Sequence, residues 1–395
     1  MPYASSAVDY RSTHATAYPV LPPKMQRSQV EALLVEVAPA LGLSGRRLQA
    51  LLFMMSQTRP QDWIDPAAEP VCYASQGEVA AGLGKTERAV RADEDALSRR
   101  LGLLEKRTAA NGGRSRHGGL GLVFSRLIEL VPALLELRER LRAERARTKT
   151  LVRLRSAYFR HLRDGLARLH PSRPADPELA LIRDALLAWP PSGTLRGLGL
   201  DALEAHVAEA RALCDRIDAV AEAFADSSGR PAETFRSHLQ DTTEDPSETC
   251  RTAPSAATGK EQENRAAPAD PQAEFAARLG PARFYALAGP DLQRCLDLAG
   301  REPRGLRPID FVSAAVQLLP QLGVNGSAWQ EAVDAMGDFR AALCVLVTDA
   351  NRDHPATPVR NPGGHLRALA RRYRSGQLNL VGSLIGLSER RRTEP

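Results

Sequence analysis

Hydrophobic positions recur at helical spacing over most of the chain. In residues 45–58 the side chains of Leu48, Leu51 and Met55 share one helix face, and leucines repeat at a spacing of about 3.5 residues over 134–169. The same spacing continues in shorter patterns over 177–189, 201–225, 311–319 and 329–346. This pattern predicts a mainly α protein.

Residues 75–127 carry a different pattern, with two short helices and a turn. Ser75 can cap a first helix with Val79, Ala80 and Leu83 inward, and Gly84 then turns the chain. Thr86 can cap a second helix, whose inward positions are Val90, Leu97 and Leu101. The predicted arrangement is a helix-turn-helix, with the 45–58 helix covering its back.

A small β-hairpin is expected after the second helix. Leu103 and Leu104 precede the polar, Gly-rich residues 108–119, and apolar residues resume over 120–124. Two short apolar runs around such a loop are typical of a hairpin. The hairpin would be the wing of a winged helix-turn-helix domain.

Gly82-Leu83-Gly84-Lys85-Thr86 resembles the end of a phosphate-binding loop. That loop reads G-x-x-x-x-G-K-[ST] and follows a buried strand, so that its backbone N–H groups surround the phosphates. Here Val79 replaces the first glycine, and the preceding residues have a helical pattern. We therefore expect no nucleotide cofactor, and no other cofactor or metal is indicated.

The winged helix predicts a DNA-binding surface. A second helix of this kind enters the major groove, where an Arg fork matches guanine, while the wing holds phosphates. The candidate base readers are Thr86, Arg88 and Arg91, and the other candidate DNA-binding residues are Gln76, Lys85, Lys106, Arg107, Arg114, Arg116 and His117. The alternative is that they are solvated side chains of an ordinary surface helix and loop.

An acidic run opposes this interpretation. Asp93, Glu94 and Asp95 lie in the second helix, where carboxylates repel phosphate, and Glu94 takes a place usually given to an apolar residue. Two explanations are open: the acids face solvent, or they accept hydrogen bonds from the N4 amino group of cytosine.

Composition divides the chain into parts. Residues 241–272 contain no Leu, Ile, Val, Met or aromatic residue, which predicts a disordered linker. The expected parts are a flexible tail (1–25), the winged-helix domain (26–130), a helical extension (131–235), the linker (236–272) and an all-α C-terminal domain (273–388). Arg155 and Gly165 interrupt the leucine repeat of the extension. The long helix of the extension could pair with itself in a homodimer or pack on the domain. His161 and His170 are interpreted as surface residues.

Charge and cysteine content add little to the choice of function. The 395 residues carry a net charge of +6, which suits a polyanionic partner, and the five cysteines form no C-x-x-C pair. No run of 18 apolar residues and no signal pattern occur. We expect a cytoplasmic protein, associated with nucleoid or plasmid, that does not enter a membrane.

Two segments resemble the RepC-type replication initiators of repABC plasmids. LGVNGSAWQEAVDAMG (322–337), followed by NPGGHLRALARRYRSGQLNL (361–380), is similar to the C-terminal domain of that family. Residues 75–127, with the preceding Asp62-Trp63, are similar to its N-terminal domain. The resemblance implies a protein that binds double-stranded DNA at a plasmid replication origin, engages the host replication machinery and uses no nucleotide.

The sequence leaves two other classes of function open to comparison, a transcriptional regulator and an enzyme. A winged-helix transcriptional regulator shares the first domain, but usually has a ligand pocket or a compact dimerisation unit in place of the linker and the Pro-Gly-Gly helix. An enzyme would need a His/Asp/Ser constellation, a metal cluster or an intact phosphate loop, and the sequence contains none of these.

Overall fold

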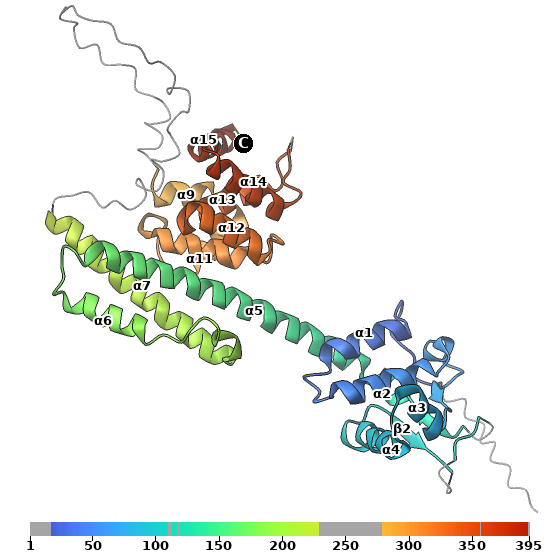
Figure 1. The fold of residues 1–395 in the computed structure, drawn as a ribbon. Coiled ribbons are helices and arrows are strands. Elements are labelled where there is room, and N and C mark those ends of the chain that lie inside the picture. Colours follow the sequence, from blue (N-terminus) through green and yellow to red (C-terminus); the bar gives the residue numbers. More distant parts are fainter. Residues whose placement is uncertain (1–16, 110–112, 117–118, 229–278, 356, 394–395) are drawn as a thin grey trace, which may run out of the picture. The chain divides into compact units, whose positions relative to one another are not determined.

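The computed structural model describes residues 17–109, 113–116, 119–228, 279–355 and 357–393. The chain forms two compact units, residues 1–145 and 146–395, and the boundary falls inside the long helix α5 (Ser125–Leu169). Helices dominate both units (Figure 1), so the prediction of a mainly α protein is confirmed. The linker predicted at 236–272 lies outside the described residues.

The first unit is a helical domain with one small sheet. Its core contains the fully buried Trp63, Phe124, Leu51 and Met54, and the Trp63 and Phe124 rings are 5.5 Å apart. Besides the beginning of α5, its elements are α1 (Arg27–Val37), α2 (Gly45–Ser56), η1 (Pro60–Trp63), β1 (Val71–Cys72), α3 (Gln76–Leu83), α4 (Glu87–Asp95), η2 (Ala96–Arg100), β2 (Glu105–Arg107) and β3 (Gly121–Val123).

The two short helices lie where the sequence predicts them. Ser75 caps α3 by accepting from the Glu78 N–H, and Thr86 caps α4 by accepting from the Ala89 N–H. Between the helices Gly84 has φ of +62°, a left-handed conformation that favours glycine. The residues before Gly84 are therefore helical, in contrast to the strand that precedes a phosphate-binding loop.

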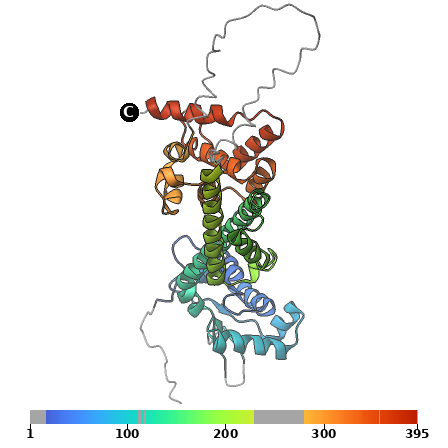
Figure 2. The ribbon, with the colours of Figure 1, turned by 90° about the vertical axis from the view of Figure 1, so that its left-hand side faces the viewer.

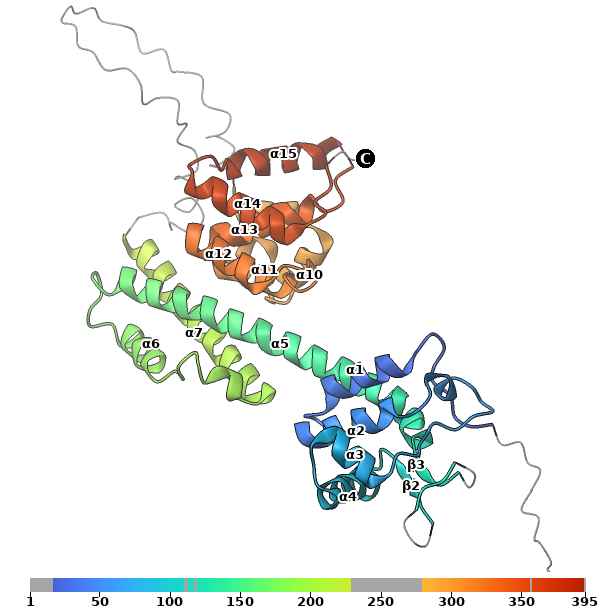
Figure 3. The same cartoon turned by 45° about the vertical axis from the view of Figure 1, so that its right-hand side comes forward.

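The sheet has three antiparallel strands in the order β1-β3-β2. Figure 3 labels the β2 and β3 strands of the hairpin. Lys106 pairs with Leu122 in the hairpin, and Val71 pairs with Val123 on the other edge. The hairpin was predicted, whereas β1 was not, because two residues are too few to show an alternating pattern. Gly121 is required at the centre, since a Cβ there would lie 2.6 Å from the Cys72 carbonyl oxygen.

The second unit is entirely helical among its described residues. One hydrophobic core extends from Leu151 to Leu387. It is formed by the end of α5 together with α6 (Pro177–Leu187), η3 (Leu195–Gly197), α7 (Leu200–Ser228), α9 (Pro281–Leu287), α10 (Pro290–Asp297), η6 (Pro303–Gly305), α11 (Pro308–Leu318), α12 (Gly326–Met336), α13 (Asp338–Ala350), α14 (Pro362–Arg374) and α15 (Leu380–Thr393). α15, the red helix that leads to the end marked C in Figure 2, packs on α9 and α13.

The interruptions in the leucine repeat of α5 have structural roles. A Cβ on Gly165 would lie 2.7 Å from Ile217 Cδ1, so the glycine lets α7 approach α5 closely. Arg155 is buried, with its guanidinium 5.1 Å from the ring centres of both Phe159 and Trp189. The C-terminal half of α5 thus packs within its own unit.

Two details differ from the sequence interpretation. The 329–346 pattern belongs to two helices, α12 and α13, which are separated at Gly337, where φ is +81°. His161 is not a surface residue, because its half-buried ring lies 2.8 Å from the Asp218 carboxylate.

Candidate nucleic-acid interface

The candidate base readers lie on the solvent side of α4. Thr86, Arg88 and Arg91 are all exposed. The Arg88 guanidinium has no hydrogen-bond or ion-pair partner within the described part of the chain, whereas that of Arg91 donates to Gln76 Oε1 at 3.2 Å. Val90, on the opposite side of α4, is buried in the core. α4 therefore presents two arginines away from its packed face.

Glu94 is buried beneath this surface and holds three polar side chains. It forms an ion pair with Arg114 and another with Lys106 at 3.2 Å, and it accepts from Gln76 Nε2 at 2.9 Å. A fully buried carboxylate neither faces solvent nor reaches a base, so neither explanation of Glu94 from the sequence is correct. Glu94 stands at an apolar position because Arg114 and Lys106 neutralise it inside the domain.

The flanking acids also pair within the domain. Asp93 lies 2.9 Å from the Lys85 ammonium and 3.7 Å from the Arg47 guanidinium. Lys85 also donates to the Arg46 carbonyl oxygen at 2.9 Å. Asp95 lies 3.4 Å from Lys106. The acidic run thus neutralises cations that surround α4.

The cations of the hairpin are mostly engaged as well. Arg107 pairs with Glu105 at 2.9 Å and Glu69 at 2.6 Å, and these bonds, that with Glu105 first, raise the pKa of its guanidinium. Arg114 donates to the Ala74 carbonyl oxygen in addition to its pair with Glu94. Arg116 is exposed and lies 5.7 Å from the Tyr73 ring centre. His117 lies outside the described residues.

A polar hollow of about 640 Å³ lies beside α4. It is lined by Gln76, Arg91, Asp95, Ser98, Arg99, Lys106 and Thr108. The exposed Arg99 guanidinium has no partner in the described parts of the structure. The sequence interpretation did not include Arg99 among the candidates. Arg99 follows α4 in the π-helical turn η2, and the spacing of apolar residues does not reveal that turn.

The predicted site residues therefore fall into two groups. Thr86, Arg88, Arg91 and Arg116 are exposed and have no acidic partner among the residues that the structure describes. Gln76 and the basic residues Lys85, Lys106, Arg107 and Arg114 instead bind carboxylates of the same domain. The exposed group is the part of the surface that offers unneutralised donors.

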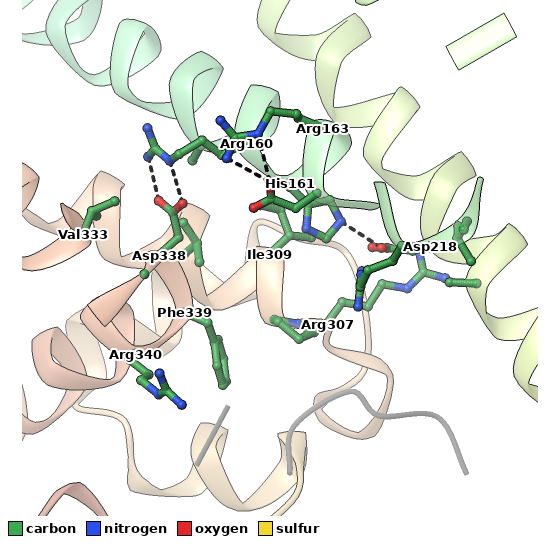
Figure 4. A pocket seen from close by; sticks show the side chains of 18 of the residues that line it. Arg160, His161, Arg163, Asp218, Arg307, Ile309, Val333, Asp338, Phe339 and Arg340 are labelled. Atoms are coloured by element: carbon green, nitrogen blue, oxygen red, sulfur yellow. Dashed lines mark hydrogen bonds and ion pairs between the residues drawn. The ribbon is translucent and has the colours of Figure 1, made fainter. Parts of the chain in front are cut away.

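The second unit contains a larger cavity of about 820 Å³ (Figure 4). Its polar walls are internally paired: Arg160 forms two bonds of 2.7 Å with Asp338, and His161 binds Asp218. Arg307 lies 3.1 Å from Glu222 on the same wall. Several of the charged groups that line the cavity are therefore already engaged with one another.

No group of three or more potential metal-ligating side chains occurs among the described residues. The four cysteines in this set, Cys72, Cys214, Cys295 and Cys344, are free. No helix in the described ranges is long and apolar enough to cross a bilayer.

The first unit places two short helices, α3 and α4, beside a β-hairpin in a mainly helical protein. The chain belongs to the replication protein C family: residues 4–169 match the Replication protein C N-terminal domain, and residues 292–390 match the Replication protein C C-terminal region. The similarity to RepC-type initiators is thereby confirmed.

Two curated relatives are similar over part of their length. The chain is 34% identical over 116 residues to a "Putative replication protein C" of Rhizobium rhizogenes, which covers 28% of this chain and 27% of the relative. It is 30% identical over 131 residues to a protein of the same name from Sinorhizobium fredii, covering 32% of this chain and 30% of the relative. The chain thus spans less than a third of each relative that it matches, and no solved structure matches it.

Proposed function

We propose that this protein is a plasmid replication initiator that binds duplex DNA at the origin through a winged helix in its first unit. In this proposal α4 enters the major groove, Arg88 and Arg91 read base edges, and Arg116 and Arg99 hold phosphates on either side. The observation that carries the proposal is the exposed, unneutralised face of α4 in a chain of the replication protein C family.

The internal ion pairs support the proposal by removing the objection from the acidic run. Asp93 and Glu94 are bound to Lys85, Arg114 and Lys106, so their charge is neutralised before DNA approaches. A phosphate near α4 would consequently meet Arg88 and Arg91, with Glu87 as the one exposed carboxylate of this helix that has no partner among the described residues. Repulsion between α4 and the backbone is reduced accordingly.

The proposed role requires no catalytic step by this chain. An initiator of this kind marks the origin and engages the host replication machinery, and we include a homodimer as part of the proposal. The domain limits proposed are those of the sequence interpretation: the winged helix over 26–130, the extension over 131–235 and the C-terminal domain over 273–388.

The test combines binding with plasmid maintenance. The purified full chain is titrated against duplex fragments tiled across its own replicon, with random duplex as the reference, at several salt concentrations. We expect preferential binding to one fragment, and that fragment should support replication of a reporter plasmid only when the protein is supplied. Binding without maintenance would favour a transcriptional regulator, and absence of binding at low salt would refute the winged-helix proposal.

A further inference from the structure

The positive charge of the chain is concentrated at its C-terminal end. Residues 360–395 hold eight arginines and two carboxylates, Glu389 and Glu394, so their net charge of +6 equals that of the whole chain. The preceding 359 residues are therefore neutral as a set. α14 alone contains four arginines and no acidic residue.

Some of these arginines hold the helices together. Arg374 lies 3.1 Å from Glu331 of α12, and Arg367 donates to Asn325 and Ser327 at the beginning of α12, each at 3.1 Å. These contacts place α14 alongside α12 with both helices running in the same direction. Arg391 of α15 donates to the Ala288 carbonyl oxygen at 2.7 Å.

Four of the eight arginines remain outside this packing, three of them in or just before α14 and the fourth, Arg392, at the end of α15. Arg360, Arg371 and Arg372 are exposed, and their guanidinium groups have no hydrogen-bond or ion-pair partner among the residues described here. The opposite side of α14 is buried through Leu366, Leu369 and Ala370. α14 therefore has an apolar face inside the unit and a cationic face outside it.

The surface lacks the features of a protein-binding interface. The exposed large hydrophobic side chains of the described residues include none in 357–393. Protein interfaces normally centre on buried aromatic or aliphatic anchors, whereas a nucleic-acid backbone is bound by cations without such anchors. At 1.5 Å per residue, the helical stretch from Pro362 to Arg372 covers roughly 15 Å, about four nucleotide steps along a duplex strand.

We propose that the outer face of α14, carried by Arg371 and Arg372 together with Arg360 just before the helix, is a second DNA-binding surface that contacts phosphates without reading sequence. The proposal rests on the function proposed above, since it gives an origin-binding protein a second contact with duplex DNA. Each guanidinium that neutralises a phosphate releases counterions, so the surface contributes to the salt dependence of binding and not to its specificity.

The test uses the full chain and a random-sequence duplex. The variant Arg360→Ala/Arg371→Ala/Arg372→Ala is compared with wild type by fluorescence anisotropy over a salt series. We expect the slope of log K against log salt to fall in magnitude by up to ~2.7, about 0.9 for each lost phosphate contact. Alanine is a good helix former, so α14 should be retained, and circular dichroism checks this.

Two matched variants separate the surface from general charge. Arg163→Ala/Arg183→Ala/Arg304→Ala removes the same charge from exposed positions of the second unit and should leave the slope unchanged. Arg360→Lys/Arg371→Lys/Arg372→Lys keeps the charge and should restore the wild-type slope. An unchanged slope in the alanine variant, or an equal loss in the charge-matched control, would overturn the proposal.

Failure of the proposed origin binding would look different. Arg88→Ala/Arg91→Ala should abolish preference for the origin fragment while keeping the contribution of α14 on random duplex. If the wild type shows no preference for any fragment, the proposal of origin recognition fails. The difference in salt slope between the α14 triple-alanine variant and its charge-matched control still decides whether α14 binds DNA.

Discussion

Glu94 of α4 and Arg114 of the hairpin segment form an ion pair inside the first unit, with side chains only 0% and 5% exposed. Twenty residues separate them in the chain, and the pair ties α4 to the segment between β2 and β3. Gln76 extends the connection, since its amide donates to Glu94 and accepts from Arg91. The carboxylate that looked unfavourable for DNA binding thereby positions a candidate base reader.

Removing the carboxylate should destabilise this region. Glu94→Leu leaves Arg114 buried without its partner, and loss of one member of a buried pair costs about 3–5 kcal/mol. Hydrogen exchange of the full chain should show the loss of protection in α3 and α4. The double variant Glu94→Leu/Arg114→Leu should recover much of it, because it removes both charges. If the double variant is as unprotected as the single one, the ion pair is not the cause.

The arginines of α4 should differ from those of the hairpin in their effect on specificity. Arg88→Ala and Arg91→Ala should each reduce preference for the origin fragment over random duplex by about 1–3 kcal/mol. Arg116→Ala should weaken binding to both duplexes alike, since a phosphate contact carries no sequence information. The sequence predicts the same uniform loss for Arg114→Ala, but its burial adds a loss of stability. Competition binding measures the ratio of affinities for the origin fragment and for random duplex. The same ratio in all variants would contradict the assignment of α4 as the reading helix.

The close approach of α7 to α5 should make Gly165 intolerant of a side chain. Gly165→Ala places a Cβ 2.7 Å from Ile217 Cδ1, and such overpacking typically costs about 1–3 kcal/mol. Gly386 of α15 is the matched control, since a Cβ there meets no atom within 4 Å, and Gly386→Ala should stabilise by about 0.5–1 kcal/mol. Hydrogen exchange in the helix that carries each glycine measures both effects. Equal stabilisation by both substitutions would show that α5 and α7 are not in close contact.

Acid should weaken the second unit through His365. Burial, followed by the nearby Arg372 guanidinium, holds the pKa of His365 below its usual range. Thr348 Oγ1 donates to the Cys344 carbonyl oxygen at 2.7 Å and so accepts from His365 Nδ1 at 2.9 Å, which places a ring proton on Nδ1.

The sign of this effect follows from the depressed pKa. The pKa of this histidine in the unfolded chain is about 6.5. As pH falls through that pKa, the unfolded chain binds a proton that the folded chain does not yet bind, so the free energy of unfolding decreases. His365→Gln keeps a hydrogen-bond donor for Thr348. It should reduce the loss of stability that α13 and α14 undergo between about pH 7 and pH 5. Hydrogen exchange at the two pH values, corrected for intrinsic rates, measures the difference. His170→Gln, at an exposed imidazole, is the control, and identical pH dependence in wild type and His365→Gln would refute the assignment.

The sequence by itself determined the local elements of this protein. The caps at Ser75 and Thr86, the turn at Gly84 and the apolar spacing of α2 predict the helix pair and the helix behind it, because caps and periodicity act over a few residues. The family was also visible, since the motifs at 322–337 and 361–380 lie within continuous stretches. Long-range partners could not be obtained in the same way.

Only the tertiary structure decided which charges are available. Lys85, Lys106 and Arg114 look equivalent to Arg88 in the sequence, yet the fold brings them against Asp93 and Glu94, while Arg88 stays exposed. The same holds for Gly165, whose role depends on Ile217 52 residues later, and for β1, whose two residues form a strand only because β3 provides the partner. Ion pairs and close packing join residues that are distant along the chain, so their energy is absent from any local pattern and appears only when the chain is folded.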